Sequence, residues 1–393
     1  MFWLLAASRV LGALLAPIPD CDEVFNYWEP LHFLVHGQGQ ETWEYSPDYA
    51  LRSYWYIFLH ALPTSLLSLL VSDRISQFRL MRVLLGLIGA KCQHFCWSRL
   101  KRMYSPEEKK TAKAVLVLNL GLFLASHTFL PSTFSMNTLL LALGFFLDYS
   151  KSKSTGKLAL CLFSCAYGVG VGWPFCIVLI FLFLLPMAHK VIFDLFSVKV
   201  LSLAIAAVAA ALVPSFLADW YYYGKPVLGV LNLVLYNTSL GRGNLAGSSL
   251  LYGVEPWYFY LTNLLLNFNL VFVGFLVYPC FLLWGLACKT EKFRWVKLGL
   301  LSCSFGWLLL MSLQPHKVPI YSGRALYVPH LPHYLHIWGG CSHSIACFRT
   351  NLLPADANLH DFAVFVDLCT ARPQLWRSAD GLVAPYGRTG VCG

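Results

Sequence analysis

Long apolar runs separated by short polar loops constrain this chain more than any other feature. A transmembrane helix needs about 20 mainly apolar residues, and runs near that length recur as far as residue 313. Only 12% of the residues are charged, whereas soluble proteins carry about 25%. The candidate spans are residues 2–18, 54–71, 78–96, 114–130, 134–147, 158–172, 175–188, 191–218, 258–287 and 298–313. We therefore expect an all-α polytopic membrane protein with about nine or ten transmembrane or membrane-embedded helices.

The positive charges lie in short loops, as the positive-inside rule requires of cytosolic loops. Basic clusters occur at residues 99–110, 151–157 and 289–297, so these three loops should share the cytosolic side. The net charge of +10 then reflects membrane orientation, and the lipid bilayer is an expected partner. Nucleic acid is not expected, because no basic patch is interleaved with aromatic residues.

The loop at residues 219–256 should lie on the opposite, lumenal side. It contains an N-x-[ST] motif that begins at Asn237, and this candidate glycosylation site could be modified only on that side. One conflict stays open. If the polar loop before Tyr54 is lumenal, an odd number of crossings must separate Tyr54 from Arg99, yet two apolar runs lie between them. Either residues 54–71 lie in the interface or re-enter the membrane, or the loop at Arg99 breaks the charge rule.

The polar segment at residues 20–54 is the first place to look for chemistry. Carboxylates at the end of a membrane helix are costly unless they face water or a polar ligand. A solvated loop with interfacial aromatic residues would explain this composition, but carboxylates mixed with aromatic rings also suit carbohydrates. The six acidic residues before Asp48 are Asp20, Asp22, Glu23, Glu29, Glu41 and Glu44.

The thirteen cysteines do not indicate a metal site. Many lie inside apolar runs, where cysteine usually behaves as a small hydrophobic residue. His94 stands between Cys92 and Cys96, but no second pair follows at zinc-binding spacing. We therefore expect no bound metal. The first apolar run lacks a basic leader and is followed by further spans, so we expect an uncleaved transmembrane helix there.

Several sequence blocks resemble a known enzyme family. They are residues 20–30 (DCDEVFNYWEP), 42–47 (TWEYSP), 50–53 (ALRS), 130–134 (LPSTF) and 251–260 (LYGVEPWYFY), with 267–269 (NFN). These blocks resemble the dolichyl-phosphate-mannose-dependent α-1,2-mannosyltransferases of the asparagine-linked glycosylation pathway, and the resemblance covers residues 8–317. It implies a GT-C fold in the endoplasmic reticulum membrane with the active site in lumenal loops. It also implies dolichyl phosphate mannose as donor and the dolichyl-diphosphate oligosaccharide precursor of N-glycans as acceptor.

The resemblance further implies roles for residues of the first loop. A β-linked donor and an α-1,2-linked product imply inversion, for which one general base on the acceptor hydroxyl suffices. Asp22 matches the family's aspartate and is the expected base, with Glu23 as the runner-up or its orienting partner. Arg52 is expected to bind the leaving phosphate through its guanidinium fork, with no metal or other cofactor. The candidate substrate-binding residues are Asp20, Asn26, Trp28, Glu29, Glu44, Tyr45, Arg52, Glu255 and Trp257.

The chain departs from the family pattern after Lys317. Residues 318–393 contain no run of spanning length and no persistent helical or strand period. We expect residues 1–317 to form a membrane-embedded GT-C mannosyltransferase region that is incomplete at its carboxyl end. Residues 318–393 are expected to form a divergent tail without a packed fold. An inactive truncated isoform is therefore one alternative.

Two other functions fit part of the sequence. One is a related mannosyltransferase of glycosylphosphatidylinositol anchor synthesis, although the long first loop, rich in tryptophan and glutamate, speaks against it. The other is a lipid or solute transporter, which would place ionisable groups near the bilayer midplane, whereas here they cluster in a loop. The sequence indicates neither the acceptor-binding residues nor the oligomeric state.

Overall fold

Helices make up the regular secondary structure of the part of the chain that the structure describes, which contains no strand. The structure is a computed structural model and describes residues 1–313 except 19, 190–196, 239–254, 269 and 288–293. The chain divides into two units, Met1–Ala325 and Leu326–Gly393. The second unit lies outside the described residues, as does the tail expected at residues 318–393. The all-α expectation is confirmed for the described residues.

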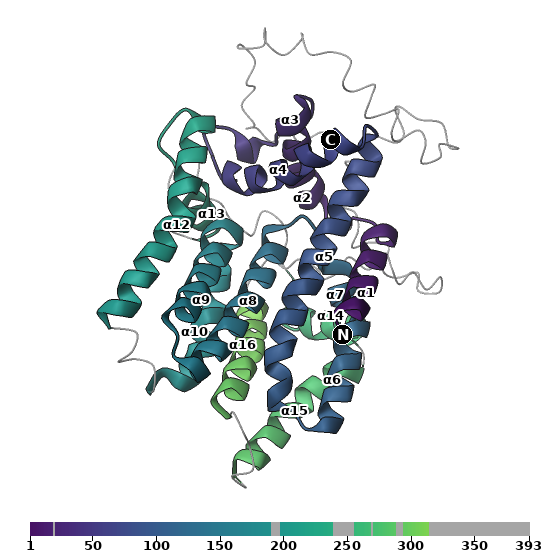
Figure 1. The fold of residues 1–393 in the computed structure, drawn as a ribbon, viewed down its shortest axis with the longest axis vertical. Coiled ribbons are helices and arrows are strands. Elements are labelled where there is room, and N and C mark those ends of the chain that lie inside the picture. The colour runs from purple at the N-terminus through teal and green to yellow at the C-terminus, as the bar shows by residue number, and fades with distance from the viewer. Residues whose placement is uncertain (19, 190–196, 239–254, 269, 288–293, 314–393) are drawn as a thin grey trace, which may run out of the picture. The chain divides into compact units, whose positions relative to one another are not determined.

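Figure 1 shows the order of the helices along the chain. The first half contains α1 (Phe2–Leu15), α2 (Cys21–Glu23), η1 (Val24–Trp28), α3 (Glu29–His36), η2 (Trp43–Tyr45), α4 (Tyr54–Leu70), α5 (Arg74–Leu100), α6 (Pro106–Leu118), α7 (Leu120–Ala125) and α8 (Pro131–Ser152). The second half contains α9 (Thr155–Tyr167), η4 (Gly168–Gly172), α10 (Ile177–Leu184), α12 (Val198–Tyr223), α13 (Gly229–Asn237), α14 (Phe259–Phe268), α15 (Leu270–Ala287) and α16 (Arg294–Leu313).

Local sequence signals set several helix boundaries. The Ser105 side chain caps α6 in a capping box with Glu108, which satisfies backbone N–H groups that have no partner within the helix. Pro131 stands in the first turn of α8, where its missing N–H costs nothing. Gly224 ends α12 in the left-handed conformation with φ 67°, which a residue without Cβ adopts at little cost. The long helices then pack in series, with α1 on α5, α5 on α8, α8 on α9 and α9 on α12.

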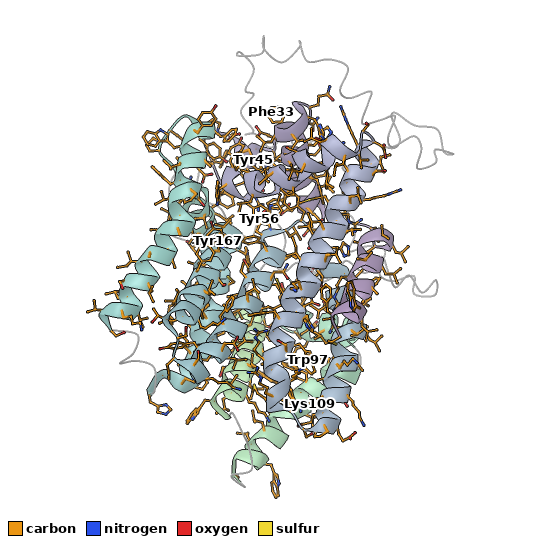
Figure 2. The ribbon with its side chains drawn as sticks, viewed as in Figure 1. Phe33, Tyr45, Tyr56, Trp97, Lys109 and Tyr167 are labelled. Carbon is orange, nitrogen blue, oxygen red and sulfur yellow. The ribbon has the colours of Figure 1, made fainter. Side chains whose placement is uncertain are left out.

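The first basic loop and the acidic loop (residues 20–54, the first loop) lie at opposite ends of the long helices. Figure 2 shows Lys109, which belongs to the first basic loop, at the lower end, and Tyr45 of the acidic loop at the upper end. At the lower end Arg99 pairs with Asp148, with Nε 3.1 Å from Oδ2. The segregation of charge matches the orientation expected from the positive-inside rule.

The position of α4 bears on the open conflict in the topology. Figure 1 shows α4 at the same end as α2 and α3, and α4 packs against α3, α12 and α5. From there α5 runs to Arg99 at the opposite end, so one long helix connects the acidic loop to the first basic loop. This arrangement favours the first alternative, in which residues 54–71 do not cross the membrane.

The structure divides one expected span into two helices. Residues 114–130 do not form a single helix, because α6 ends at Leu118 and Asn119 leaves the helical conformation with ψ 113° before α7 begins. The fully buried Arg9 of α1 donates from Nη2 to the Leu116 carbonyl at 2.7 Å and from Nε to Gln93 Oε1 at 3.0 Å. Since the last carbonyls of a helix lack partners within it, Arg9 stabilises the break.

Fewer helices than expected are at least 18 residues long and also apolar enough to span a membrane. In the described part of the chain, three helical segments are long and apolar enough: Thr155–Gly172, Val198–Tyr223 and Trp295–Leu313. Shorter apolar helices occupy Phe2–Leu15, Tyr54–Leu70, Pro174–Met187 and Phe272–Gly285. The chain is thus a helical membrane protein, and the number of nine or ten spans stays a prediction.

Candidate active site

The first loop begins with a short helix that sends neighbouring acidic residues in different directions. Asp20 caps α2 by accepting a hydrogen bond from the Asp22 N–H at 2.9 Å. Consecutive residues of a helix point about 100° apart. The Asp22 side chain is therefore 54% exposed, whereas Glu23 is 1% exposed. The two candidates for the catalytic base consequently occupy different environments.

Glu23 holds two parts of the protein together. Its Oε1 accepts hydrogen bonds from the Phe129 N–H at 2.9 Å and from the Trp28 indole at 3.0 Å. Burial raises the pKa of this carboxyl, while the bonds from Phe129 and Trp28 and the charge of Arg82 act in the opposite direction. Phe129 lies just before the Leu130–Phe134 block at the start of α8. Glu23 thus fixes that block to the first loop, which favours an orienting role over contact with a substrate.

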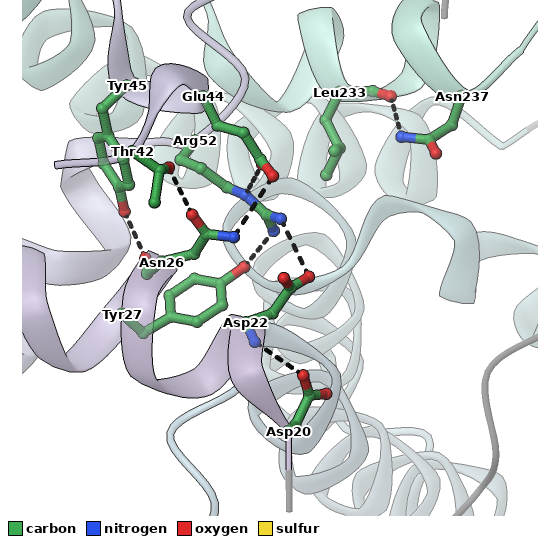
Figure 3. Close-up of polar contacts among 10 residues, drawn as sticks. All are labelled: Asp20, Asp22, Asn26, Tyr27, Thr42, Glu44, Tyr45, Arg52, Leu233 and Asn237. Atoms are coloured by element: carbon green, nitrogen blue, oxygen red, sulfur yellow. Dashed lines mark hydrogen bonds and ion pairs between the residues drawn. The ribbon is translucent and has the colours of Figure 1, made fainter. Parts of the chain in front are cut away.

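Asp22 instead lies beside the guanidinium of Arg52 (Figure 3). Asp22 Oδ2 is 3.5 Å from Arg52 Nη2, and Glu44 Oε2 is 2.5 Å from Arg52 Nε. Arg52 also donates a hydrogen bond to the Tyr27 hydroxyl, and burial raises the pKa of this phenol to about 12. Tyr27 therefore stays neutral near pH 7, and the cluster consists of one cation between two carboxylates.

Buried residues behind Glu44 keep the cluster in place. Asn26 donates from Nδ2 to Glu44 Oε1 at 3.3 Å, and Thr42 donates to Asn26 Oδ1 at 2.6 Å. The Tyr45 hydroxyl donates to the Asn26 carbonyl at 2.7 Å. Asn26 and Tyr45 are both buried, so in this structure they support the cluster from behind. The exposed edge of the cluster belongs to Asp22.

A small cavity adjoins Arg52 on the side of α13. The first loop, the start of α4, the start of α8, η4 and α13 all contribute to its wall. It is lined by Tyr27, Leu51, Arg52, Ser53, Tyr56, Pro131, Val171, Gly172, Val230 and Leu233. The Leu130–Phe134 block and the first loop, which are far apart in the sequence, therefore meet at one cavity.

Other candidate residues lie further from the cluster or face elsewhere. The Trp28 ring packs edge-on against Phe78 and Phe129, with centroids 4.7 and 4.9 Å away. Glu29 is half-buried and begins α3. Trp257, which precedes α14 together with Glu255, is exposed, and its ring lies against Tyr258.

Asn237 ends α13 one turn beyond the cavity-lining Leu233. It is exposed, and its side-chain amide donates to the Leu233 carbonyl at 2.9 Å (Figure 3). The last residue of its sequon, Ser239, lies outside the described residues. Modification of Asn237 stays a prediction.

Three residues that contact the cluster or its backbone were not among the candidates predicted from the sequence. Tyr27 binds the Arg52 side chain, Tyr223 binds the Arg52 carbonyl, and Asp219 binds the two residues that follow Arg52. A signal for Asp219 was available, because a carboxylate near the end of a long apolar helix is rare without a function. The two tyrosines carried no such signal in a chain that is 16% aromatic.

The expectation of no metal is not tested by the geometry. Asp20, Cys21 and Asp22 carry ligand atoms within 4.8 Å of one another. Asp22 and Cys21 are exposed, and Asp20 already caps α2. Exposed acidic residues close in sequence often gather without an ion, so metal-independent chemistry stays a prediction.

Comparison with known proteins places this site in context. The sequence profile of the Alg9-like mannosyltransferase family matches residues 1–319. The chain is 38% identical to an α-1,2-mannosyltransferase ALG9 of Mus musculus over 329 residues, which are 80% of this chain and 50% of the relative. It is 33% identical to the α-1,2-mannosyltransferase alg9 of Schizosaccharomyces pombe, covering 80% of this chain and 54% of the relative.

The chain also matches a more distant relative. The GPI mannosyltransferase 3 of Yarrowia lipolytica is 27% identical over 288 residues, which are 72% of this chain and 52% of the relative. The chain thus spans about half the length of the curated relatives that it matches. No solved structure matches it.

Proposed function

The chain belongs to the Alg9-like mannosyltransferase family, and from this premise we propose that it transfers mannose from dolichyl phosphate mannose to the lipid-linked oligosaccharide precursor of N-glycans. The new linkage is α-1,2. Because the chain spans about half the length of its curated relatives, transfer by this chain itself is part of the proposal. The observation that carries it is the exposed Asp22 carboxylate held 3.5 Å from Arg52.

The proposed reaction is a single displacement at the anomeric carbon of mannose. The 2-hydroxyl oxygen of the acceptor sugar attacks C1, and the C1–O bond to phosphate breaks with its electron pair staying on the phosphate oxygen. Asp22 takes the hydroxyl proton as the new bond forms. Dolichyl phosphate leaves as an anion, so no acid is needed to protonate the leaving group.

Arg52 supplies positive charge for that anion. A guanidinium presents a rigid fork of N–H donors that matches phosphate oxygens. In the structure the fork is shared among Asp22, Glu44 and Tyr27. We propose that the phosphate takes over the contact with Asp22, which is the longest of the three, and thereby leaves Asp22 free to accept a proton.

The proposed location is the endoplasmic reticulum membrane, with the active site on the lumenal side. The first basic loop, which contains Lys109, lies at the opposite end from the acidic loop, which contains Tyr45 (Figure 2), and this separation supports the orientation through the positive-inside rule. The donor and acceptor both carry dolichol chains, so a site at the end of apolar helices can receive their head groups while the chains stay in lipid.

A mannosyltransferase of glycosylphosphatidylinositol synthesis is the second candidate, favoured by the similarity to the Yarrowia lipolytica relative. The two candidates differ in acceptor. The identity of 27% to that relative is lower than the identities of 38% and 33% to the N-glycan enzymes, which supports the first.

A transfer assay with two acceptors tests the proposal. Membranes from cells that lack the endogenous enzyme, with and without this chain, receive radiolabelled dolichyl phosphate mannose and either a defined lipid-linked oligosaccharide or a mannosylated glycosylphosphatidylinositol. We expect label on the oligosaccharide only when the chain is present, and release of that label by an α-1,2-specific mannosidase. Label on the glycosylphosphatidylinositol alone would favour the second candidate. Transfer to neither acceptor would reject both.

A further inference from the structure

The backbone that carries Arg52 is held by the end of α12 and by α13. The turn before Arg52 includes Ala50, a buried residue with φ 45°, a conformation that costs energy for a residue with Cβ and persists only when its surroundings hold it. Asn232 of α13 donates from Nδ2 to the carbonyls of Tyr49 and Ala50, each at 3.2 Å. Contacts from α13 therefore stabilise the backbone conformation just before Arg52.

Asp219 of α12 fixes the residues on the other side of Arg52. It is fully buried, and its Oδ1 accepts from the Ser53 hydroxyl and from the Tyr54 N–H, each at 2.9 Å. Its Oδ2 accepts from the Gly229 N–H at 2.8 Å. Within the described residues no Lys, Arg or His forms an ion pair with this carboxylate. A buried charge of this kind is costly, and such groups in apolar helices usually serve a function.

Tyr223 reaches Arg52 itself, one helical turn after Asp219. Its hydroxyl donates to the Arg52 carbonyl at 2.6 Å. Gly229 lies against the same peptide unit, and a Cβ there would stand 2.9 Å from the Arg52 carbonyl carbon. Peptide atoms of Arg52 are thus bound or closely packed by Tyr223 and Gly229, while Asp219 holds the next two residues.

We propose that Asp219 and Tyr223 are positioning residues that aim the Arg52 guanidinium at the donor phosphate. This inference rests on the proposed function, in which Arg52 binds that phosphate. A small rotation of the peptide at Arg52 changes the direction of its Cα–Cβ bond. Because the side chain is long, the guanidinium at its end is displaced further than the Cβ atom. Because a guanidinium fork needs both distance and angle, a shift of this kind weakens phosphate binding without removing any group that touches the substrate.

The test replaces one hydroxyl at a time. Tyr223→Phe removes the bond to the Arg52 carbonyl and keeps the ring beside Tyr54, whose centroid is 5.1 Å away. Tyr222→Phe is the matched control, because its ring stacks on Tyr54 at 4.4 Å, and among the described residues no hydrogen bond from its hydroxyl is found. The readouts are retention of radiolabelled dolichyl phosphate mannose by the purified 393-residue chain, mannose transfer and thermal unfolding.

We expect Tyr223→Phe to weaken retention of the donor about three- to tenfold, while the unfolding temperature falls by no more than about 4 °C. Tyr222→Phe should match wild type in all readouts. Asp219→Asn should weaken retention at least as much, because an amide nitrogen cannot accept the bond from Gly229. Its unfolding temperature is expected to fall, so the conclusion depends on Tyr223→Phe.

A second arm asks whether the effect passes through Arg52. In an Arg52→Lys background the charge is a flexible ammonium rather than a rigid fork, so Tyr223→Phe should weaken retention by a further factor below about two. An equal effect of Tyr223→Phe on retention in both backgrounds, or no effect of Tyr223→Phe in the wild-type background, would overturn the inference.

The outcomes also separate this inference from the proposed function. If the wild-type chain transfers mannose and the Tyr223→Phe variant retains donor equally well, the positioning role is wrong and the proposed function stands. If wild type retains donor without transfer, the proposed function fails while retention still tests positioning. If wild type retains no donor, both fail.

Discussion

The Asp22 carboxylate and the Arg52 guanidinium lie 3.5 Å apart, although 30 positions separate the two residues in the sequence. The contact places a group that can accept a proton next to one that can bind a phosphate. Glu44 holds Arg52 from another side, so the arginine stays in place if the contact to Asp22 is released. A proton acceptor and an anion site side by side are what an inverting transfer from a phosphate donor requires.

The first prediction concerns Arg52. Arg52→Lys keeps the positive charge but loses the planar fork, so we expect the KM for dolichyl phosphate mannose to rise about tenfold or more. Arg74→Lys is the matched control, because Arg74 is exposed and its guanidinium contacts Gln38 rather than the cluster. Steady-state transfer at varied donor concentration measures the effect. An unchanged KM in Arg52→Lys would contradict the assignment of Arg52 to the phosphate.

Glu23 is expected to act on stability rather than on proton transfer. Glu23→Gln keeps an oxygen that can accept from the Phe129 and Trp28 N–H groups, so we expect it to retain transfer. Glu23→Ala leaves two buried donors without a partner and should lower the free energy of unfolding by about 2–4 kcal/mol. Thermal unfolding and transfer are measured on both variants. Loss of transfer in a stable Glu23→Gln protein would instead identify Glu23 as the base.

The orientation of the first loop can be tested with the chain's own cysteine. Cys21 is exposed beside Asp22. If the loop is lumenal, a membrane-impermeant maleimide should label Cys21 only after sealed microsomes are opened. The Cys21→Ser variant serves as the control, because it removes this label and leaves any label on other cysteines. A label that Cys21→Ser removes in intact microsomes would place the loop in the cytosol and contradict the proposal.

Metal independence is a further prediction. The proposed step uses Arg52 as the cation for the leaving phosphate, so transfer should continue at an unchanged rate in excess EDTA. The relevant alternative is an ion held by Asp20, Cys21 and Asp22, whose ligand atoms lie within 4.8 Å of one another. That alternative would be established if EDTA abolished transfer and added Mn²⁺ or Mg²⁺ restored it in the wild-type protein, while the added ion restored no transfer in an Asp20→Asn protein.

The helical class and the place of the chemistry could be read from the sequence. Apolar runs and basic loops predicted a membrane helix protein with charge segregated between its ends, and the acidic loop indicated where polar residues gather. Asp22, Glu44 and Arg52 all lie within the first loop, which the sequence already indicated as the place of the chemistry. Local patterns were sufficient for these features.

Other features depend on contacts that the sequence does not display. The different directions of Asp22 and Glu23 follow from the phase of α2, which has three residues and no period to read. The break at Asn119 is stabilised by Arg9, which lies more than 100 positions away and donates a hydrogen bond to the Leu116 carbonyl. Asp219 accepts a hydrogen bond from the Tyr54 N–H, although 165 positions separate the two residues. Tertiary packing decides such details, and a single sequence gives no direct measure of it.

The role of Asp22 as the base is the central claim, and Asp22→Asn tests it most directly. The change keeps the size of the side chain and removes its ability to accept a proton at neutral pH. Asp48→Asn is the matched control, because Asp48 is an exposed acid of the same loop. In single-turnover transfer from saturating dolichyl phosphate mannose to the lipid-linked oligosaccharide, we predict that Asp22→Asn lowers the rate about 10²- to 10⁴-fold at unchanged expression, while Asp48→Asn stays near the wild-type rate. An Asp22→Asn protein that transfers mannose as fast as wild type would contradict the account.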